Sequence, residues 1–264
     1  MTVSERHNVK LRGSGQRSMM FAHGFGCDQN MWRFVTPAFE DRFRVVLFDL
    51  MGAGGSDLDA FDPDKYSKLE GYAEDVVQLA EELSLRDAVF VGHSVSGMIG
   101  LLAARQAPHL FSELVMVGPS PRYIDEPASG YVGGFSEAQI HELLDFLDSN
   151  HMGWSQAMAP VIMGNADRPD LAGELTNSFC RTDPEIAKHF ARTTFLSDNR
   201  ADLAGFPVRT LILQCSDDVI APECVGQYVH RSLPDSELVL MKATGHCPNL
   251  SAPEETIEAI QAFV

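Results

Sequence analysis

The sequence predicts an α/β fold, in which a mostly parallel central sheet is flanked by helices and carries one inserted helical segment. Short apolar, β-branched runs alternate with helical periods along most of the chain, as expected for βαβ units. This alternation stops after residues 119–121, Pro-Ser-Pro, and resumes near residue 205. A chain of 264 residues, 45% of them hydrophobic, can bury one large core. We therefore expect a core built from residues 1–121 and 205–264, and a helical lid over residues 122–204.

Each expected strand is a short run rich in Val, Ile, Leu, Phe or Met. These runs are residues 8–11, 18–22, 44–48, 88–91, 113–117, 208–214 and 237–241. Helical periods fall between the strands and at the end of the chain, at residues 69–83, 97–106 and 253–263. The inserted segment has no convincing strand. It has four helical stretches separated by Gly, Pro and Asp, at residues 136–150, 154–163, 169–181 and 184–197.

The most informative stretch is Gly92-His93-Ser94-Val95-Ser96, because an expected strand leads into it and an expected helix leaves it. A strand, a sharp turn and a helix with a central Ser form a nucleophile elbow. A Ser hydroxyl attacks carbonyl groups poorly at its ordinary pKa, so the turn must bring its oxygen within reach of a base. Gly92 allows the strand and the helix to approach closely, and Ser96 stands where a second glycine is usual.

Candidates for the acid and the base follow in the order Ser, Asp, His that this architecture requires. Asp217 and Asp218 come after the sixth expected strand, and His246 comes after the seventh. Both places are carboxyl ends of strands, where open α/β sheets build their sites. His246 would take the proton of Ser94, and the Asp would fix the imidazole tautomer. Spacing alone does not choose between the two carboxylates; we favour Asp218, four residues before Pro222, with Asp217 as a solvated loop charge.

An oxyanion hole is expected in the segment His23-Gly24-Phe25-Gly26, which follows the second expected strand. Stabilising the developing negative charge needs two backbone N–H groups in a suitable loop. From the geometry of the elbow we expect these donors to be Val95 and Phe25, with the Phe25 ring forming a wall of the pocket. The position of the helical lid allows it to roof this site and to exclude water.

The pocket is expected to be apolar, because aromatic and sulfur-containing residues are frequent in the lid. Most of them should pack the lid helices together, and the others should face the ligand. No basic or Gly-rich cradle for a phosphate is evident, which favours a small, apolar and neutral ligand. The expected lining residues are Phe25, Tyr123, Phe135, Trp154, Met158, Phe195, Val219 and Ile220.

Each of these features has a structural interpretation when it is taken alone. A buried Ser can satisfy a helix N-terminus, a His-Gly pair before an aromatic residue is often a turn, and an Asp pair can cap a loop. Together these interpretations would require a coincidence of four features at the right places, so we favour a hydrolase site. The remaining histidines lack the paired spacing of metal ligands, and we expect neither a metal nor a cofactor.

Charge and cysteine content indicate which classes of partner and which cellular compartment are to be expected. The chain has 20 basic and 37 acidic residues, and its net charge of −17 repels phosphate backbones and anionic lipid surfaces. We therefore expect no nucleic-acid partner and no membrane association. Five scattered cysteines, an odd number, favour reduced thiols and a cytoplasmic location over a disulfide framework. Residues 1–6 contain no apolar signal region, and no run approaches the roughly 20 apolar residues of a membrane helix.

Five segments together carry a resemblance to a known family. They are HGFGCDQNMW at 23–32, GHSV at 92–95, MVGPSP at 116–121, LQC at 213–215 and GHCP at 245–248. From about residue 8 to its C-terminus, the chain resembles the RsbQ-like α/β-hydrolases, which include a bacterial stress regulator and the plant karrikin and strigolactone receptors. The resemblance implies an α/β-hydrolase sheet under a four-helix lid. It also implies that Ser94 is the nucleophile, Asp218 the acid and His246 the base, with Phe25 and Val95 as oxyanion donors.

Two functions from different classes follow. The first is a serine hydrolase that acts on small esters, lactones or butenolides. The second, implied by the resemblance, is a ligand-dependent signalling protein that hydrolyses its ligand slowly and acts through a protein partner at the lid. Turnover separates them, since a metabolic esterase reaches about 1 to 1,000 reactions per second. Haloalkane or epoxide opening is disfavoured, because enzymes of this fold that catalyse it use an Asp nucleophile where this chain has Ser94.

Overall fold

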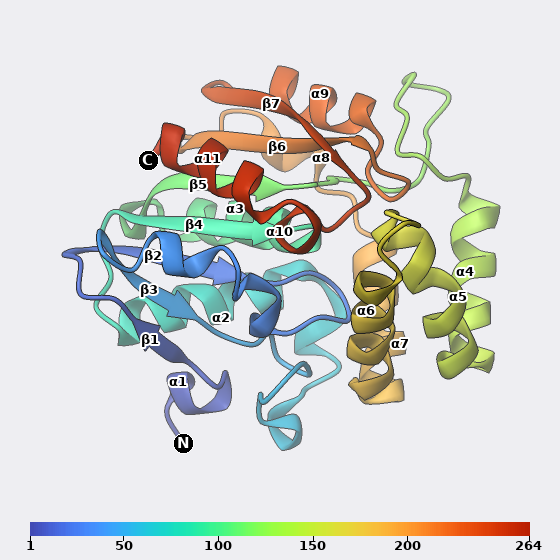
Figure 1. Cartoon of the computed structure of the whole chain (residues 1–264), viewed down its shortest axis with the longest axis horizontal. Helices are drawn as coiled ribbons and strands as arrows, with labels where there is room; N and C mark the ends of the chain where they lie inside the picture. Colours follow the sequence, from blue (N-terminus) through green and yellow to red (C-terminus); the bar gives the residue numbers. More distant parts are fainter.

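The computed structural model covers residues 1–264 and contains a seven-stranded sheet packed between helices (Figure 1). The strand order is β1-β3-β2-β4-β5-β6-β7, and all neighbours are parallel except β1, which pairs antiparallel to β3. The mostly parallel sheet predicted from the sequence is therefore confirmed, with strand ends shifted by a few residues. The strands are β1 (Lys10–Arg12), β2 (Arg17–Ala22), β3 (Phe43–Leu47), β4 (Ala88–His93), β5 (Phe111–Val117), β6 (Arg209–Asp217) and β7 (Ser236–Thr244).

Helices cover both faces of the sheet, so the central strands are buried on both sides. Alternate side chains of β4 enter two separate cores: Val89 and Val91 pack on the side of α11, and Phe90 packs on the side of α2 and α3. Apart from the four long helices between β5 and β6, the helices are α1 (Val3–Arg6), α2 (Leu69–Glu82), α3 (Val95–Gln106), α8 (Arg200–Leu203), α9 (Glu223–Ser232), α10 (Pro248–Ser251) and α11 (Pro253–Phe263). Five short 3₁₀ turns lie in the connections.

Four helices form an insertion between β5 and β6, and Figure 1 shows them gathered at the end of the sheet towards which β4 points. They are α4 (Glu137–Ser149), α5 (His151–Met163), α6 (Pro169–Arg181) and α7 (Pro184–Phe195). The four helical stretches expected here are all present. α5 begins earlier than expected because the Asn150 side chain accepts a hydrogen bond from the Gly153 N–H at 2.9 Å and so caps it.

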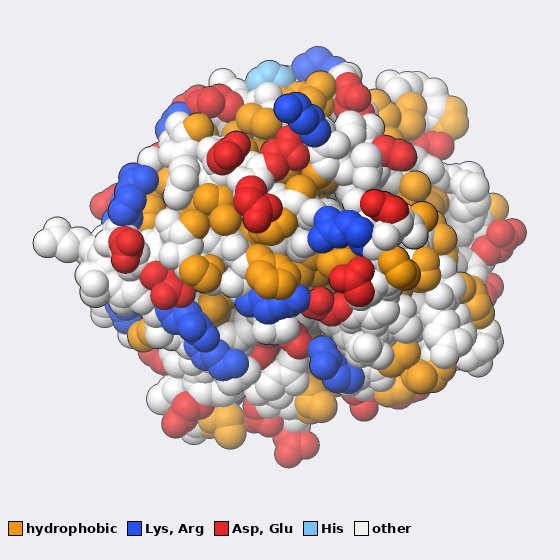
Figure 2. Space-filling view, viewed as in Figure 1, with side chains coloured by type: hydrophobic (Ala, Val, Ile, Leu, Met, Phe, Trp, Pro, Cys, Tyr) orange, Lys and Arg blue, Asp and Glu red, His pale blue; other side chains and the backbone are white.

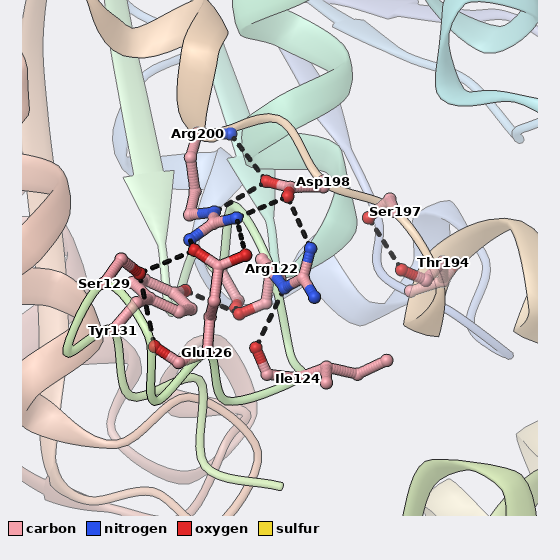
Figure 3. Close-up of polar contacts among 10 residues, drawn as sticks. Arg122, Ile124, Glu126, Ser129, Tyr131, Thr194, Ser197, Asp198 and Arg200 are labelled. Atoms are coloured by element: carbon pink, nitrogen blue, oxygen red, sulfur yellow. Dashed lines mark hydrogen bonds and ion pairs between the residues drawn. The ribbon is translucent and has the colours of Figure 1, made fainter. Parts of the chain in front are cut away.

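A cluster of four charged side chains ties together the two segments that join the insertion to the sheet (Figure 3). Arg122, just after β5, contacts Asp198 at 2.5 Å, and Asp198 also contacts Arg200 at 2.7 Å. Arg200 reaches back to Glu126 at 2.9 Å. The main chain adds a hydrogen bond from the Asn199 N–H to the carbonyl that precedes Arg122. The segment that leaves β5 and the segment that returns towards β6 are therefore held side by side at the base of the insertion.

The surface mixes charges of both signs. On the face shown in Figure 2, acidic and basic side chains are interspersed, with apolar side chains scattered among them. Acidic residues outnumber basic ones over the whole chain, 37 to 20. None of the helices is at once long enough and apolar enough to span a membrane.

Candidate active site

Ser94 occupies the turn between β4 and α3 and has an unusual backbone conformation, with φ +57° and ψ −125°. Such a conformation is costly for a residue with a side chain and persists only where the surroundings hold it. Here the Ser94 N–H donates to the carbonyl of Val117 on the next strand at 2.8 Å. A side chain at Gly92 would come within 2.3 Å of the Ser96 carbonyl oxygen, so only glycine allows this turn. The strained turn holds Ser94 at the carboxyl end of the strand.

Ser96 stands where the elbow usually has a second glycine, and its side chain fits inside the turn. Its side chain is fully buried and its hydroxyl donates to the His23 carbonyl at 2.5 Å. This bond joins the elbow to the loop of residues 23–28 that follows β2. A side chain at Gly24 in that loop would lie 3.2 Å from the Ser94 Cβ, so loop and elbow are in close contact.

The structure brings Ser94, His246 and Asp218 into one chain of hydrogen bonds. His246 Nε2 lies 2.8 Å from Ser94 Oγ, and His246 Nδ1 lies 2.7 Å from Asp218 Oδ2. Since a carboxylate only accepts, the proton belongs on Nδ1 and leaves Nε2 free to accept from the Ser94 hydroxyl. The other Asp218 oxygen accepts two main-chain N–H groups, those of Ile220 and Ala221, at 2.8 and 3.1 Å.

Electrostatics keep Asp218 ionised although its side chain is buried. Burial raises the pKa of this carboxyl, but the neighbouring His246 and the two N–H donors outweigh burial and hold the pKa below its ordinary value. Asp217 is exposed and makes no contact with His246 through its side chain. Of the two adjacent carboxylates, the structure thus joins Asp218 to the imidazole.

His93 contacts both the main chain and the ring of His246. Its Nε2 lies 2.7 Å from the His246 carbonyl oxygen, and the two rings are 5.0 Å apart between centroids. Burial, and then the nearby His246, lower the pKa of His93 to about 3, so its ring is neutral and donates from Nε2. No local sequence pattern indicates this contact, because the two residues are 153 positions apart.

Two backbone N–H groups are available near Ser94. The N–H of Phe25 donates to no acceptor of the protein. Val95 is the first residue of α3, so its N–H has no acceptor within the helix. Gly26 follows with φ +68°, and a side chain there would meet the Phe179 ring of α6 at 2.3 Å. The loop that carries Phe25 is thus pressed directly against the insertion.

The cavity over Ser94 is small, about 30 Å³, and its walls are mostly apolar. Four expected lining residues do border it: Phe25, Tyr123, Phe195 and Ile220. Residues that line it without having been expected are Cys27, His93, Ile162, Leu175, Phe179, Thr194 and Cys247. Burial raises the pKa of Cys27 to about 12 and that of Cys247 well above its ordinary value, so both thiols stay protonated.

Phe135, Trp154, Met158 and Val219 were also expected to line the pocket, but none of them borders this cavity. Val219 points to solvent with 46% of its surface exposed, although its neighbour Ile220 faces the cavity. Trp154 stands behind the wall, with its ring 5.9 Å from that of Phe25. Met158 and Phe135 are partly buried in the packing around the larger core. Helical spacing predicts which residues share a face, but not how far along that face a cavity extends.

Comparisons with known proteins agree with this architecture. The family model described as "Alpha/beta hydrolase family" matches residues 19–259. The karrikin insensitive 2 receptor CA of Petunia hybrida is 38% identical, over 98% of this chain and 95% of that protein. The strigolactone esterase D14 of Arabidopsis thaliana is 36% identical, over 98% and 96%. A solved hydrolase from Oleispira antarctica superposes with a TM-score of 0.96 at 41% identity, covering 99% of this chain and 95% of that chain. The chain belongs to the alpha/beta hydrolase family.

Proposed function

We propose that the chain is a serine hydrolase in which Ser94 attacks the acyl carbon of a small apolar ester or lactone. The observation that carries the proposal is the unbroken chain of hydrogen bonds from Asp218 through His246 to Ser94 at the surface of an apolar cavity. The similar protein from Arabidopsis thaliana is named as an esterase, which supports the same class of reaction here.

Acylation uses the three side chains in order. As Ser94 Oγ bonds to the carbonyl carbon, His246 Nε2 takes the hydroxyl proton. The carbonyl oxygen becomes negative and accepts hydrogen bonds from the N–H groups of Phe25 and Val95. The tetrahedral intermediate then breaks its bond to the leaving oxygen, which receives the proton from His246. Asp218 stays ionised throughout and stabilises the imidazolium that forms.

Deacylation repeats the sequence with water as the nucleophile. His246 removes a proton from the water, whose oxygen bonds to the acyl carbon. Collapse of the second intermediate releases the carboxylic acid and returns the proton to Ser94 Oγ. A lactone opens by the same steps, with its own ring oxygen as the leaving group, and it leaves as a hydroxy acid.

The cavity walls restrict the substrate. No Lys, Arg, Asp or Glu side chain lines the cavity, and an unpaired ionised group would be costly to bury there. This favours a neutral acyl group. Drug-sized ligands occupy about 300 to 1,000 Å³, far more than the 30 Å³ seen here, so a larger substrate requires the insertion to move.

The first test is hydrolysis of an aryl acetate together with intact-mass analysis after exposure to a serine-directed phosphonate. We expect stoichiometric labelling of the wild-type chain and none of Ser94→Ala. Ser94→Ala and His246→Ala should each lower kcat by about 10⁴- to 10⁶-fold with the fold retained, because the residues act as a unit. Labelling that persists in Ser94→Ala would show that another residue is the nucleophile.

A ligand-dependent signalling role is the second candidate. It is favoured by the similarity to a protein named as a karrikin insensitive 2 receptor and by apolar side chains exposed on the insertion. Phe146, Met152 and Val161, on α4 and α5, are 39%, 52% and 50% exposed. A partner protein could bind this surface. Its binding would depend on the ligand only if the ligand binds one position of the insertion more tightly than another.

Turnover number and partner binding separate the two candidates. We expect a signalling protein to turn over its ligand well below the usual esterase range of about 1 to 1,000 per second. It should also bind a partner of its host more tightly with ligand than without, in the Ser94→Ala variant as well. Rapid turnover with no ligand-dependent partner would exclude the signalling role, and the hydrolase would remain as the only candidate function.

A further inference from the structure

α5 of the insertion ends against the turn that carries His246. Gly164 and Asn165 adopt φ values of +60° and +54°, which end the helix and leave carbonyl groups of its last turn without helical partners. The freed carbonyl of Ile162 accepts a hydrogen bond from the main-chain N–H of His246 at 2.9 Å. The insertion thus touches the backbone of the expected general base directly.

The side chain of Asn165 connects the end of α5 to the end of β7. Its Nδ2 donates to the Met163 carbonyl of the insertion at 2.9 Å and to the Thr244 carbonyl of β7 at 3.0 Å. An amide carries two N–H donors, so the group is used fully as a bridge. A side chain at Gly245 would lie only 1.9 Å from the Met163 carbonyl oxygen. The two backbones are therefore in contact, with no room for another side chain between them.

We propose that Asn165 is a positioning residue for His246, through which the insertion fixes the placement of the base. The inference rests on the proposed role of His246 in proton transfer. The imidazole works only while Nε2 stays at about its present 2.8 Å from Ser94 Oγ. A displacement of about 1 Å can cost about a hundredfold in rate. The insertion is consequently part of the catalytic framework at this point, and it cannot separate from β7 here without releasing the histidine turn.

The test compares Asn165→Gly with the wild type, because glycine keeps the positive φ and removes only the bridging amide. We expect kcat for a small aryl acetate to fall by about tenfold to a hundredfold, with KM changed by less than about threefold, because the defect lies in proton transfer. The NMR resonance of the His246 Nδ1 proton, followed in ¹⁵N-histidine-labelled protein, should broaden or shift. Asn177→Gly, at an exposed position of α6, is the matched control for a glycine in the insertion.

A lower melting temperature in Asn165→Gly with unchanged kcat and an unchanged His246 resonance would overturn the proposal and leave Asn165 a merely structural residue. The same loss of kcat in Asn177→Gly would also overturn it. If the wild type hydrolyses no ester, the proposed function fails. The comparison of the His246 resonance between wild type and Asn165→Gly still decides whether Asn165 positions the histidine, since it needs no substrate.

Discussion

At the scale of single residues, the two adjacent aspartates show how a shift of one position decides a role. β6 runs on to Asp217, whose side chain is exposed and whose carbonyl accepts from the Gly245 N–H at 2.6 Å. The next residue, Asp218, turns inward to His246 and to the N–H groups that follow it. Asp217 therefore contacts the histidine turn through its backbone, whereas Asp218 contacts His246 through its carboxylate.

This difference predicts unequal effects of the same substitution. Asp218→Asn keeps the shape of the side chain but favours the wrong tautomer of His246, so kcat should fall by about 10⁴-fold. Asp217→Asn should leave kcat within about twofold of the wild type, since only its main chain is used. The measurement is the rate of aryl acetate hydrolysis for both variants side by side. An equal loss in the two variants would mean that Asp217 takes part in the reaction.

The residue types of the site follow from the sequence, but their supports do not. Ser94, His246 and an Asp after β6 are predictable because each follows a recognisable strand in a fixed order. His93 and Asn165 give no such signal. Their contacts reach across 153 and 79 positions and exist only after the sheet and the insertion have assembled. Local pattern carries no information about such contacts.

At the scale of elements, α5 shows what periodicity does and does not predict. Trp154, Met158 and Ile162 recur every four residues, so they share one face of the helix. Only Ile162, in the last turn, borders the cavity; Trp154 lies behind the Phe25 ring. The two residues of α5 that were expected to line the pocket, Trp154 and Met158, therefore share a face with a residue that does, but the direction of the helix axis relative to the elbow depends on packing with the other helices.

The charged cluster at the base of the insertion should lose its stabilising effect in acid. The hydrogen bonds of Arg200 to Glu126 and to Asp198 are the main reason why the pKa of each carboxyl falls to about 2. The ordinary values are about 4.3 and 3.9. Because the folded-state pKa lies below the unfolded value, the stabilising contribution is complete above about pH 5 and is lost as pH falls towards about 2.

We therefore expect hydrogen exchange of residues 122–135, corrected for its intrinsic pH dependence, to accelerate between about pH 5 and pH 2.5. The change should be no more than about fivefold, because exposed ion pairs contribute little. Arg200→Gln should remove most of this acid dependence. Arg192→Gln is the matched control, since Arg192 pairs with Asp148 elsewhere on the insertion. Acid dependence as strong in Arg200→Gln as in the wild type would contradict a role for the cluster.

At the scale of the whole molecule, the insertion is fastened to the core around the small cavity over Ser94. α5 is bound to the histidine turn, and Ser178 of α6 donates to the Gly26 carbonyl in the loop of residues 23–28 at 2.8 Å. The Phe25 ring lies between aromatic rings of α5, α6 and α7, with centroid distances of 5.7 to 6.0 Å to Trp154, Phe179, Phe190 and Phe195. A ligand of ordinary size must separate some of these contacts.

The size of a group attached to Ser94 should therefore control the dynamics of the insertion. A methylphosphonate adduct adds few atoms to the 30 Å³ cavity, whereas a hexylphosphonate adduct far exceeds it. We expect the hexyl adduct to raise amide hydrogen exchange in α6 and α7 relative to the methyl adduct, with β4 unchanged because it is buried on both faces. Phe179→Ala, which removes one wall at a cost of about 3–5 kcal/mol in stability, should reduce the difference between the adducts. Identical exchange in the two adducts would mean that side-chain rotation alone enlarges the cavity and that the helices need not move.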